Sequence, residues 1–270
     1  MDHSTSPMSA IVALNADVLN DLEQVRMANE ARLRSLLDPE WGKGISRDLA
    51  FEEVGRIEEL VNAVKAQERD AIRHLEAAMR KHELGAFVQA TPGLGLKTVA
   101  RFLGSVGPLH DRETVSQLFA YCGLHVVDGK APRPTRGKRL GFNAEARKRA
   151  FCMAEPCIKA IGFSRTSKNG KVTHIPRSPY RDTYEQARAK YTDSVARVDY
   201  VRYDKDLKRQ AVYLSAGEPL PDWLQHARAV RSVMKAIVGD LWAESRRAHG
   251  LSTSRRKPSE VGDVKEALAA

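Results

Sequence analysis

The chain has 270 residues and is basic, with 44 lysines and arginines against 34 acidic residues and a formal net charge of +10. This length allows a sizeable core, and the charge favours a polyanionic partner such as nucleic acid. Aromatic residues make up 6% of the chain, too few for a broad base-stacking platform. Cys122, Cys152 and Cys157 are odd in number and lack CxxC spacing, so neither a cysteine zinc site nor a disulfide framework is indicated, and reduced thiols in the cytoplasm fit best. No apolar run is long enough to cross a membrane.

Two long, charged helices are predicted in residues 1–84. The first runs from about residue 11 to residue 37, and helical spacing predicts that its buried face consists of Ile11, Leu14, Val18, Leu22 and Val25. The second runs from about residue 48 to residue 84, and its apolar residues alternate in steps of three and four, as in a coiled coil. The two helices form either an antiparallel pair or an intermolecular coiled coil. A homo-oligomer through these helices is therefore one of two alternatives.

A Pro-Gly-x-Gly turn at residues 92–95 lies between two short apolar segments, a layout typical of a helix-hairpin-helix. Glycine takes positive φ easily and lets another backbone approach. Free N–H groups at the start of the second helix favour an anion. We therefore predict that Gly93, Gly95, Lys97 and Thr98 bind a DNA phosphate without reading a base. The alternative is a tight turn between helices whose glycines serve geometry alone.

A basic loop rich in glycine and proline follows at residues 125–141. Its charges cannot be buried without partners, so we predict that they contact nucleic-acid phosphates. The alternative is a mobile surface loop in a basic protein. The basic residues of the loop are Lys130, Arg133, Arg136, Lys138 and Arg139.

The C-terminal part is also predicted to be largely helical. Residues 162–179 read as a loop or a small hairpin, and Tyr180 to Tyr203 read as a helix. The last helix runs from Asp222 to about His249, with an expected buried stripe of Ala227, Val230, Met234, Ile237, Val238 and Leu241. The tail, residues 252–270, is expected to be disordered.

Strands are scarce, so the fold class is mainly α. We expect a long helix pair or coiled coil over residues 1–84 and a helix-hairpin-helix domain with the basic loop over residues 85–190. C-terminal helices follow over residues 191–251.

The residues alone favour binding over catalysis. No P-loop, HExxH or GxSxG motif occurs. Acidic residues between 52 and 83 lie on the polar face of a helix, without the strand platform that usually gathers carboxylates around two metal ions. No metal site is predicted either, since the histidines lack ligand spacing: His74, His110, His125, His174, His226 and His249.

The order of these segments resembles the C-terminal part of the IS110 insertion-sequence transposases, relatives of the Piv DNA invertase. The resemblance rests on the turn at residues 91–95, on Phe119 to Leu124, on the Arg-Gly-Lys-Arg-Leu-Gly segment at 136–141, and on the late helix at 226–242. It covers about residues 15 to 250, with an apparent insertion near 190–215. It implies DNA cutting and rejoining guided by a bridge RNA. It also implies two active parts, a RuvC-like domain with four acidic ligands for Mg²⁺ and a serine nucleophile in the loop that follows Leu124.

The chain departs from that pattern on both active parts. Residues 1–14 leave no room for a RuvC-like fold, and residues 125–141 contain no serine. The family's serine would fall near Lys130 and Ala131, and Thr135 has no base placed to activate it. We therefore expect a truncated, catalytically impaired DNA-binding protein of transposase type, without catalytic residues, metal or cofactor. A guide RNA is an implied further partner, and whether the chain is an enzyme is left open. The alternatives are an RNA-binding regulatory protein and a coiled-coil structural adaptor.

Overall fold

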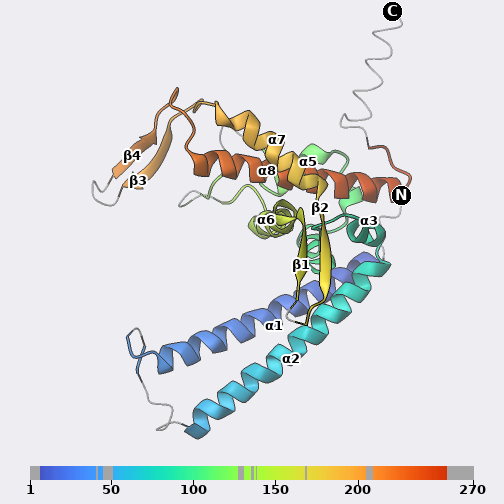
Figure 1. Cartoon of the computed structure of the whole chain (residues 1–270), viewed down its shortest axis with the longest axis vertical. Helices are drawn as coiled ribbons and strands as arrows, with labels where there is room; N and C mark the ends of the chain where they lie inside the picture. The colour runs from blue at the N-terminus through green and yellow to red at the C-terminus, as the bar shows by residue number, and fades with distance from the viewer. Residues whose placement is uncertain are drawn as a thin grey trace, which may run out of the picture.

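The computed structural model describes residues 7–40, 42–44, 51–126, 131–134, 137, 139–167, 169–204 and 209–253. Within these residues helices dominate, accompanied by two small two-stranded sheets. A long helix pair extends from a body built by the remaining helices (Figure 1). The prediction of a mainly α fold with a long N-terminal helix pair is thus confirmed. Most of the predicted disordered tail lies outside the described residues. None of the described helices is long and apolar enough to span a membrane.

The N-terminal pair consists of α1 (Pro7–Leu37) and α2 (Phe51–Lys81), which run antiparallel and side by side within one chain (Figure 1). An ion pair joins them midway, with Arg26 Nε 2.7 Å from Glu68 Oε1. Beyond it a small apolar cluster closes the far end, formed by Leu33, Val54 and Val61. The antiparallel alternative therefore describes this pair, and a homo-oligomer through these helices stays a prediction.

The prediction of which face of α1 is buried is wrong. Ile11, Leu14, Val18 and Val25 are exposed, and Leu22 is half-buried, whereas the buried positions are Val12, Ala16, Leu19 and Leu33. The reason lies in α4 (Leu96–Val106), which packs against α1. Gly104 of α4 comes so close that a Cβ on it would lie 3.0 Å from the Cβ of Ala16. Small residues let the two backbones approach, and the bulkier stripe turns away from the contact.

The body contains five further α-helices and one turn of 3-10 helix in the described part of the chain. They are α3 (Gly85–Ala90), η2 (Leu109–Asp111), α5 (Val115–Tyr121), α6 (Ala144–Lys159), α7 (Pro179–Thr192) and α8 (Asp222–Ala248). Side-chain caps set several starts, as at α6, where Asn143 Oδ1 accepts from the N–H of Ala146 at 2.9 Å. One apolar core joins the body to the helix pair, with Leu75 and Met79 of α2 among its members.

The buried stripe of α8 largely follows the prediction. Ala227 is exposed, while the other predicted positions are buried: Val230, Met234, Ile237, Val238 and Leu241. Ala227 lies near the start of the helix and itself lines a cavity described below. The stripe therefore begins one turn later than its spacing suggests.

The strands form two separate antiparallel hairpins. β1 (Ile161–Thr166) pairs with β2 (Val172–Arg177), which confirms the small-hairpin alternative. β3 (Tyr200–Asp204) pairs with β4 (Arg209–Leu214), so the predicted helix from Tyr180 to Tyr203 is wrong beyond Thr192. Residues 195–203 are rich in valine and tyrosine, which fit a pleated surface better than a helix. Backbone pairing also holds them, since the N–H of Ala196 donates to the carbonyl of Glu218 at 2.8 Å.

Candidate nucleic-acid interface

The predicted hairpin forms a tight turn between α3 and α4. The N–H of Leu94 donates to the carbonyl of Thr91 at 3.1 Å, and Gly93 adopts φ +91°. Gly95 is the N-cap of α4 but has φ −107°, so only the first of the two glycines uses the left-handed region. The prediction of positive φ is therefore right for Gly93 and wrong for Gly95.

Lys97 and Thr98 lie in the first turn of α4, as predicted. The Thr98 hydroxyl donates to the carbonyl of Gly95 at 2.8 Å, which leaves its oxygen as an acceptor and removes its hydrogen from any ligand. The first N–H groups of an α-helix have no intrahelical partner. Phosphate binding by Gly93, Gly95, Lys97 and Thr98 stays a prediction, with backbone N–H groups and the Lys97 amine as its donors.

The basic loop is only partly described. Arg133 and Arg139 are exposed. The other predicted cations of the loop, Lys130, Arg136 and Lys138, lie outside the described residues. The loop is tied to the body through its backbone, because Nη1 of Arg147 in α6 donates to the carbonyl of Pro132 at 2.8 Å. Arg133 is thereby carried to the edge of a cavity.

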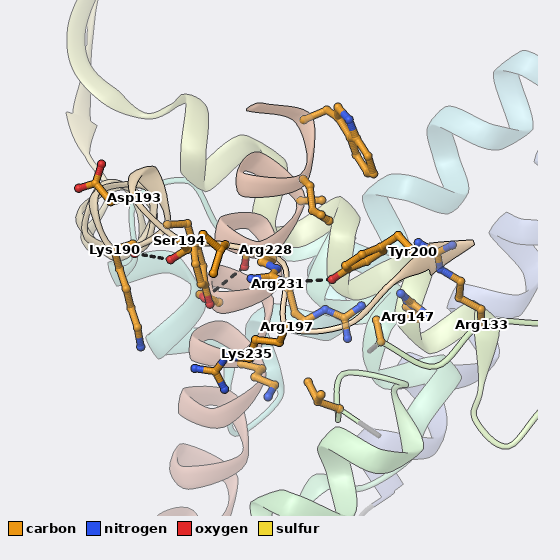
Figure 2. A pocket seen from close by; sticks show the side chains of 18 of the residues that line it. Arg133, Arg147, Lys190, Asp193, Ser194, Arg197, Tyr200, Arg228, Arg231 and Lys235 are labelled. Atoms are coloured by element: carbon orange, nitrogen blue, oxygen red, sulfur yellow. Dashed lines mark hydrogen bonds between the residues drawn. The ribbon is translucent and has the colours of Figure 1, made fainter. Parts of the chain in front are cut away.

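This cavity, here called the basic pocket, has a volume of about 980 Å³. It lies between the end of α7, the start of β3, the N-terminal half of α8 and the loop that holds Arg133 (Figure 2). Among the described residues that line it, Asp193 is the one acidic residue. The lining contains seven basic residues: Arg133, Arg147, Lys190, Arg197, Arg228, Arg231 and Lys235.

Three of these cations come from one face of α8. Arg228, Arg231 and Lys235 follow one another in steps of three and four, opposite the buried stripe. Two of their charged groups lie over aromatic rings, with Arg228 Cζ 5.6 Å from the ring centroid of Tyr191 and Lys235 Nζ 5.5 Å from that of Phe119. The helix thus presents a row of cations to the cavity, which Figure 2 shows from close by.

Arg231 is half-buried and lies close to two other cations, Arg147 and Arg133. Its Nη1 donates to the carbonyl oxygens of His125 and Gly123, at 3.3 and 3.5 Å. Burial, together with Arg147 and Arg133, lowers the pKa of Arg231 to about 10. Burial and Arg133 likewise lower the pKa of Arg147. Arg231 is still charged at neutral pH, and the positive charges of Arg147 and Arg133 lie close enough to affect it.

No carboxylate of the described chain forms an ion pair with any of the seven cations of the basic pocket. The partners that they do have are neutral, such as the Tyr200 hydroxyl, which accepts from Arg228 Nη2 at 2.8 Å. Elsewhere in the described body, buried arginines such as Arg101 do have acidic partners. The basic pocket is therefore a site that lacks its counter-charge, and an anion would supply it.

Aromatic side chains line the same cavity: Tyr191, Tyr200 and Trp223. Trp223 is 51% exposed although it is large and apolar, and its ring lies 6.1 Å from that of Tyr213. An exposed indole beside guanidinium groups offers a surface on which a base or a sugar can rest.

Of the six predicted site residues that the structure describes, only Arg133 lines the basic pocket. The hairpin residues are not part of its lining, so the hairpin and the basic pocket are separate features. The basic pocket draws instead on α7, α8 and the segment after α7, which sequence reasoning did not select. The three-and-four spacing of Arg228, Arg231 and Lys235 is the signal that could have found it.

Among curated proteins, the chain is similar to the "Insertion element IS110 uncharacterized 43.6 kDa protein" of Streptomyces coelicolor, with 28% identity over 108 residues. The match covers 39% of this chain and 27% of that protein, so the chain aligns with about a quarter of its relative. No family model and no solved structure matches the chain. The relationship to an IS110 insertion-element protein is the kinship that the comparisons support.

Proposed function

We propose that the chain is a DNA-binding protein of transposase type and that its basic pocket holds the phosphate backbone of the nucleic acid. One observation carries this proposal. Seven cations line one cavity, and none of them has a carboxylate partner in the described part of the chain. Such crowding raises the free energy of the empty protein and is relieved when an anion binds.

The size and composition of the cavity favour a polymer over a small anion. A volume of about 980 Å³ exceeds what a single phosphate needs. The cations come from α6, α7, α8, the basic loop and the segment between α7 and β3, and Tyr191 and Trp223 lie among them. Phosphate contacts of this kind fix a backbone and carry no sequence information. The proposed binding is therefore strong at low salt and indifferent to sequence.

The kinship to an IS110 insertion-element protein supports the transposase assignment. In this proposal the turn at Gly93 and Gly95, with Lys97 and Thr98, adds a second phosphate contact away from the basic pocket. The basic loop, including Lys130, Arg136, Lys138 and Arg139, extends the charged surface. Residues 125–141 include no serine, so the proposal assigns binding to this surface and names no catalytic residue. In this proposal side chains and backbone N–H groups bind the phosphates, without a metal ion or cofactor.

The test is fluorescence anisotropy of the purified chain with a labelled duplex, over a salt series. The informative variant replaces three exposed or half-exposed cations of the basic pocket, as Arg133→Gln, Arg197→Gln and Lys235→Gln together. Its control carries the same loss of charge on the helix pair, as Arg34→Gln, Arg73→Gln and Lys81→Gln, all of which are exposed. If the basic pocket holds phosphates, the pocket variant reduces the magnitude of the slope of log K against log salt by about 2–3. The control variant changes this slope much less.

Equal effects of the two triple variants would mean that binding follows net charge alone and would overturn the assignment to this cavity. A structured RNA of similar length, measured at the same salt, separates the two polymers. Tighter binding of RNA than of duplex would replace DNA by RNA as the partner.

A further inference from the structure

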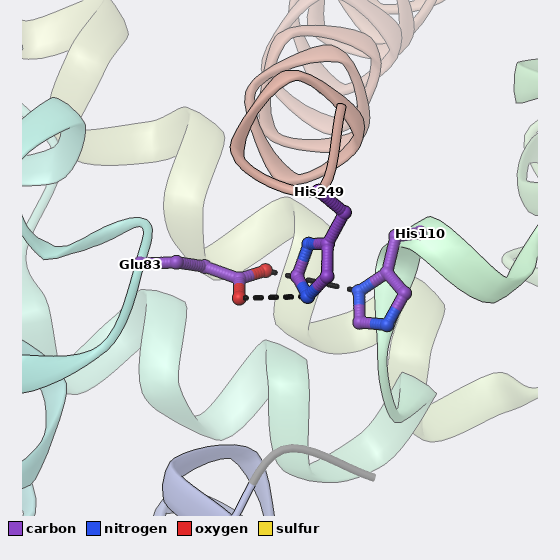
Figure 3. A group of neighbouring side chains, drawn as sticks. All are labelled: Glu83, His110 and His249. Atoms are coloured by element: carbon purple, nitrogen blue, oxygen red, sulfur yellow. Dashed lines mark ion pairs between the residues drawn. The ribbon is translucent and has the colours of Figure 1, made fainter. Parts of the chain in front are cut away.

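Away from the basic pocket, three potential metal ligands meet where α2, η2 and α8 end. Glu83 lies in the turn after α2, His110 in η2, and His249 at the C-cap of α8 (Figure 3). One ligand atom from each of the three lies within 4.8 Å of the other two. We propose that Glu83, His110 and His249 bind a divalent transition-metal ion of the zinc class, which ties these three segments together.

The distances within this cluster suit a shared cation better than direct hydrogen bonds. His249 Nε2 lies 3.5 Å from Glu83 Oε2, and His110 Nδ1 lies 3.8 Å from Glu83 Oε1. N–H···O bonds in proteins span about 2.7–3.2 Å. Two ligands of a tetrahedral zinc ion, each about 2.0–2.1 Å from the metal, lie roughly 3.3–3.5 Å apart. The two gaps between Glu83 and the imidazoles are therefore close to the spacing of two ligands on one ion.

Hydrogen bonds on the outer side prepare each ring nitrogen as a ligand. His249 Nδ1 lies 2.9 Å from the carbonyl of Ser245, which can only accept, so this nitrogen carries the hydrogen and Nε2 presents its lone pair to Glu83. His110 Nε2 lies 3.5 Å from Asp111 Oδ1, which favours the tautomer with a free lone pair on Nδ1. Metal-binding histidines typically donate their other N–H to a carbonyl or carboxylate in this way.

Glu83 is oriented in the same fashion. The hydroxyl of Ser245, which is buried, donates to Glu83 Oε1 at 2.6 Å. Because that hydroxyl has a single hydrogen, it has none left for His110 Nδ1, 3.3 Å away. The Glu83 carboxylate and the lone pairs of His110 Nδ1 and His249 Nε2 thus point toward one another, with no hydrogen-bond donor between them. A cation in this space would satisfy all three.

The surroundings fit a site that a metal can reach. The side chains of Glu83 and His110 are 17% and 14% exposed, and that of His249 is 31% exposed. The two imidazole rings stack with centroids 3.6 Å apart. Since a metal lies in the plane of each ring that binds it, one ring must turn when the ion enters.

A fourth residue nearby, His82, is excluded as a ligand by its own bonds. Its Nδ1 accepts from the N–H of Leu84 at 3.2 Å, and its Nε2 lies 3.1 Å from the Ser9 hydroxyl. The site therefore offers two imidazoles and one carboxylate. This set suits Zn²⁺ and leaves a fourth position for water or another ligand.

The experiment uses the full chain without a histidine tag, stripped with EDTA. Zinc affinity is measured by competition with a chromophoric chelator, stoichiometry by elemental analysis, and stability by thermal unfolding. We expect one zinc per chain and a Tm that rises with zinc concentration. Cobalt in place of zinc should give the visible absorption of a tetrahedral site.

Four variants decide the assignment. His249→Gln and Glu83→Gln each remove a ligand at a partly exposed position and should weaken zinc binding at least about 100-fold. Asp111→Ala removes only the outer partner of His110 and should weaken zinc binding about 10-fold. His226→Gln, an exposed histidine on the same helix α8, is the matched control and should change nothing. If zinc leaves Tm unchanged, or if His249→Gln and Glu83→Gln bind zinc like the control, the proposal is wrong. Binding by the basic pocket is a separate matter, because none of the three ligands lines it.

Discussion

Gly93 in the hairpin turn rests directly on Cys157 of α6. A Cβ on Gly93 would lie 2.7 Å from the Cα of Cys157, closer than such atoms come in proteins. Gly95, two residues later, is exposed, and a Cβ there would meet only the Thr98 hydroxyl, at 3.3 Å. The first glycine is therefore required by packing and by its positive φ. The second is the one that leaves room for a ligand.

This contrast predicts different results for two alanine substitutions. Gly93→Ala should lower the free energy of unfolding by about 2–4 kcal/mol, since it combines a strained φ with a clash against backbone. Gly95→Ala should stay within about 0.5 kcal/mol of the parent, as is usual for a surface change. Urea unfolding followed by circular dichroism measures both. A Gly93→Ala protein as stable as the parent would show that the turn does not pack on α6 as described.

We predict that Arg231 contributes to duplex binding but does not stabilise the unbound protein. Replacing it as Arg231→Met removes a cation that Arg147 and Arg133 crowd, and should leave the stability of the unbound protein unchanged or raise it by about 1 kcal/mol. The same change should weaken duplex binding about 10-fold or more at low salt. Thermal unfolding and anisotropy, with exposed Arg34→Met as control, test the two parts. A less stable protein with unchanged affinity would contradict the proposed role.

Sequence periodicity predicted the existence of elements better than their environment. The long helix pair, the hairpin at Asn169 and Gly170, and most of the α8 stripe follow from spacing and turn residues. The buried face of α1 does not, because its sequence has two stripes at helical spacing. Which of the two stripes is buried depends on Gly104, which is distant in sequence. Because Gly104 has no side chain, Ala16 can pack closely against it.

The candidate site was harder to predict for a similar reason. The basic loop and the hairpin stand out as short motifs, whereas the basic pocket is assembled from segments that are far apart in the chain, such as Arg147 and Arg231. Likewise, Glu83, His110 and His249 have no spacing that suggests a metal site, and only the packing of α8 against η2 brings them together. Charge that lacks a partner can be recognised only once the fold is known.

The contact between α7 and α8 that shapes one wall of the basic pocket depends on a buried tyrosine. Tyr180 donates its hydroxyl to Asp240 Oδ2 at 2.9 Å, and burial together with Asp240 raises the pKa of the phenol. Tyr180→Phe should lower the free energy of unfolding by about 1–2 kcal/mol. Tyr184→Phe, on the same helix but with a more exposed bond to His226, should cost less than about 0.5 kcal/mol. Chemical unfolding of the two variants side by side provides the measurement, and equal losses would contradict the special role of Tyr180.

Asn20 of α1 connects the helix pair to the body. Its Oδ1 accepts from Arg101 of α4, at 2.5 and 3.0 Å, and from Nη2 of Arg149 in α6, at 2.8 Å. The side chains of both arginines are only 10% exposed, so their guanidinium groups depend on protein acceptors.

Asn20→Ala should therefore lower the free energy of unfolding by about 2–3 kcal/mol, because two largely buried guanidinium groups lose an acceptor together. Asn20→Asp keeps the oxygen and adds a negative charge between two cations, so at neutral pH it should match the parent or exceed it by about 1 kcal/mol. The comparison separates loss of the acceptor from a mere change of side chain. If both variants unfold like the parent, the helix pair is held by its apolar contacts alone. If Asn20→Asp is less stable than the parent, the charges at this junction are already balanced by Glu23, which forms an ion pair with Arg101 at 2.6 Å.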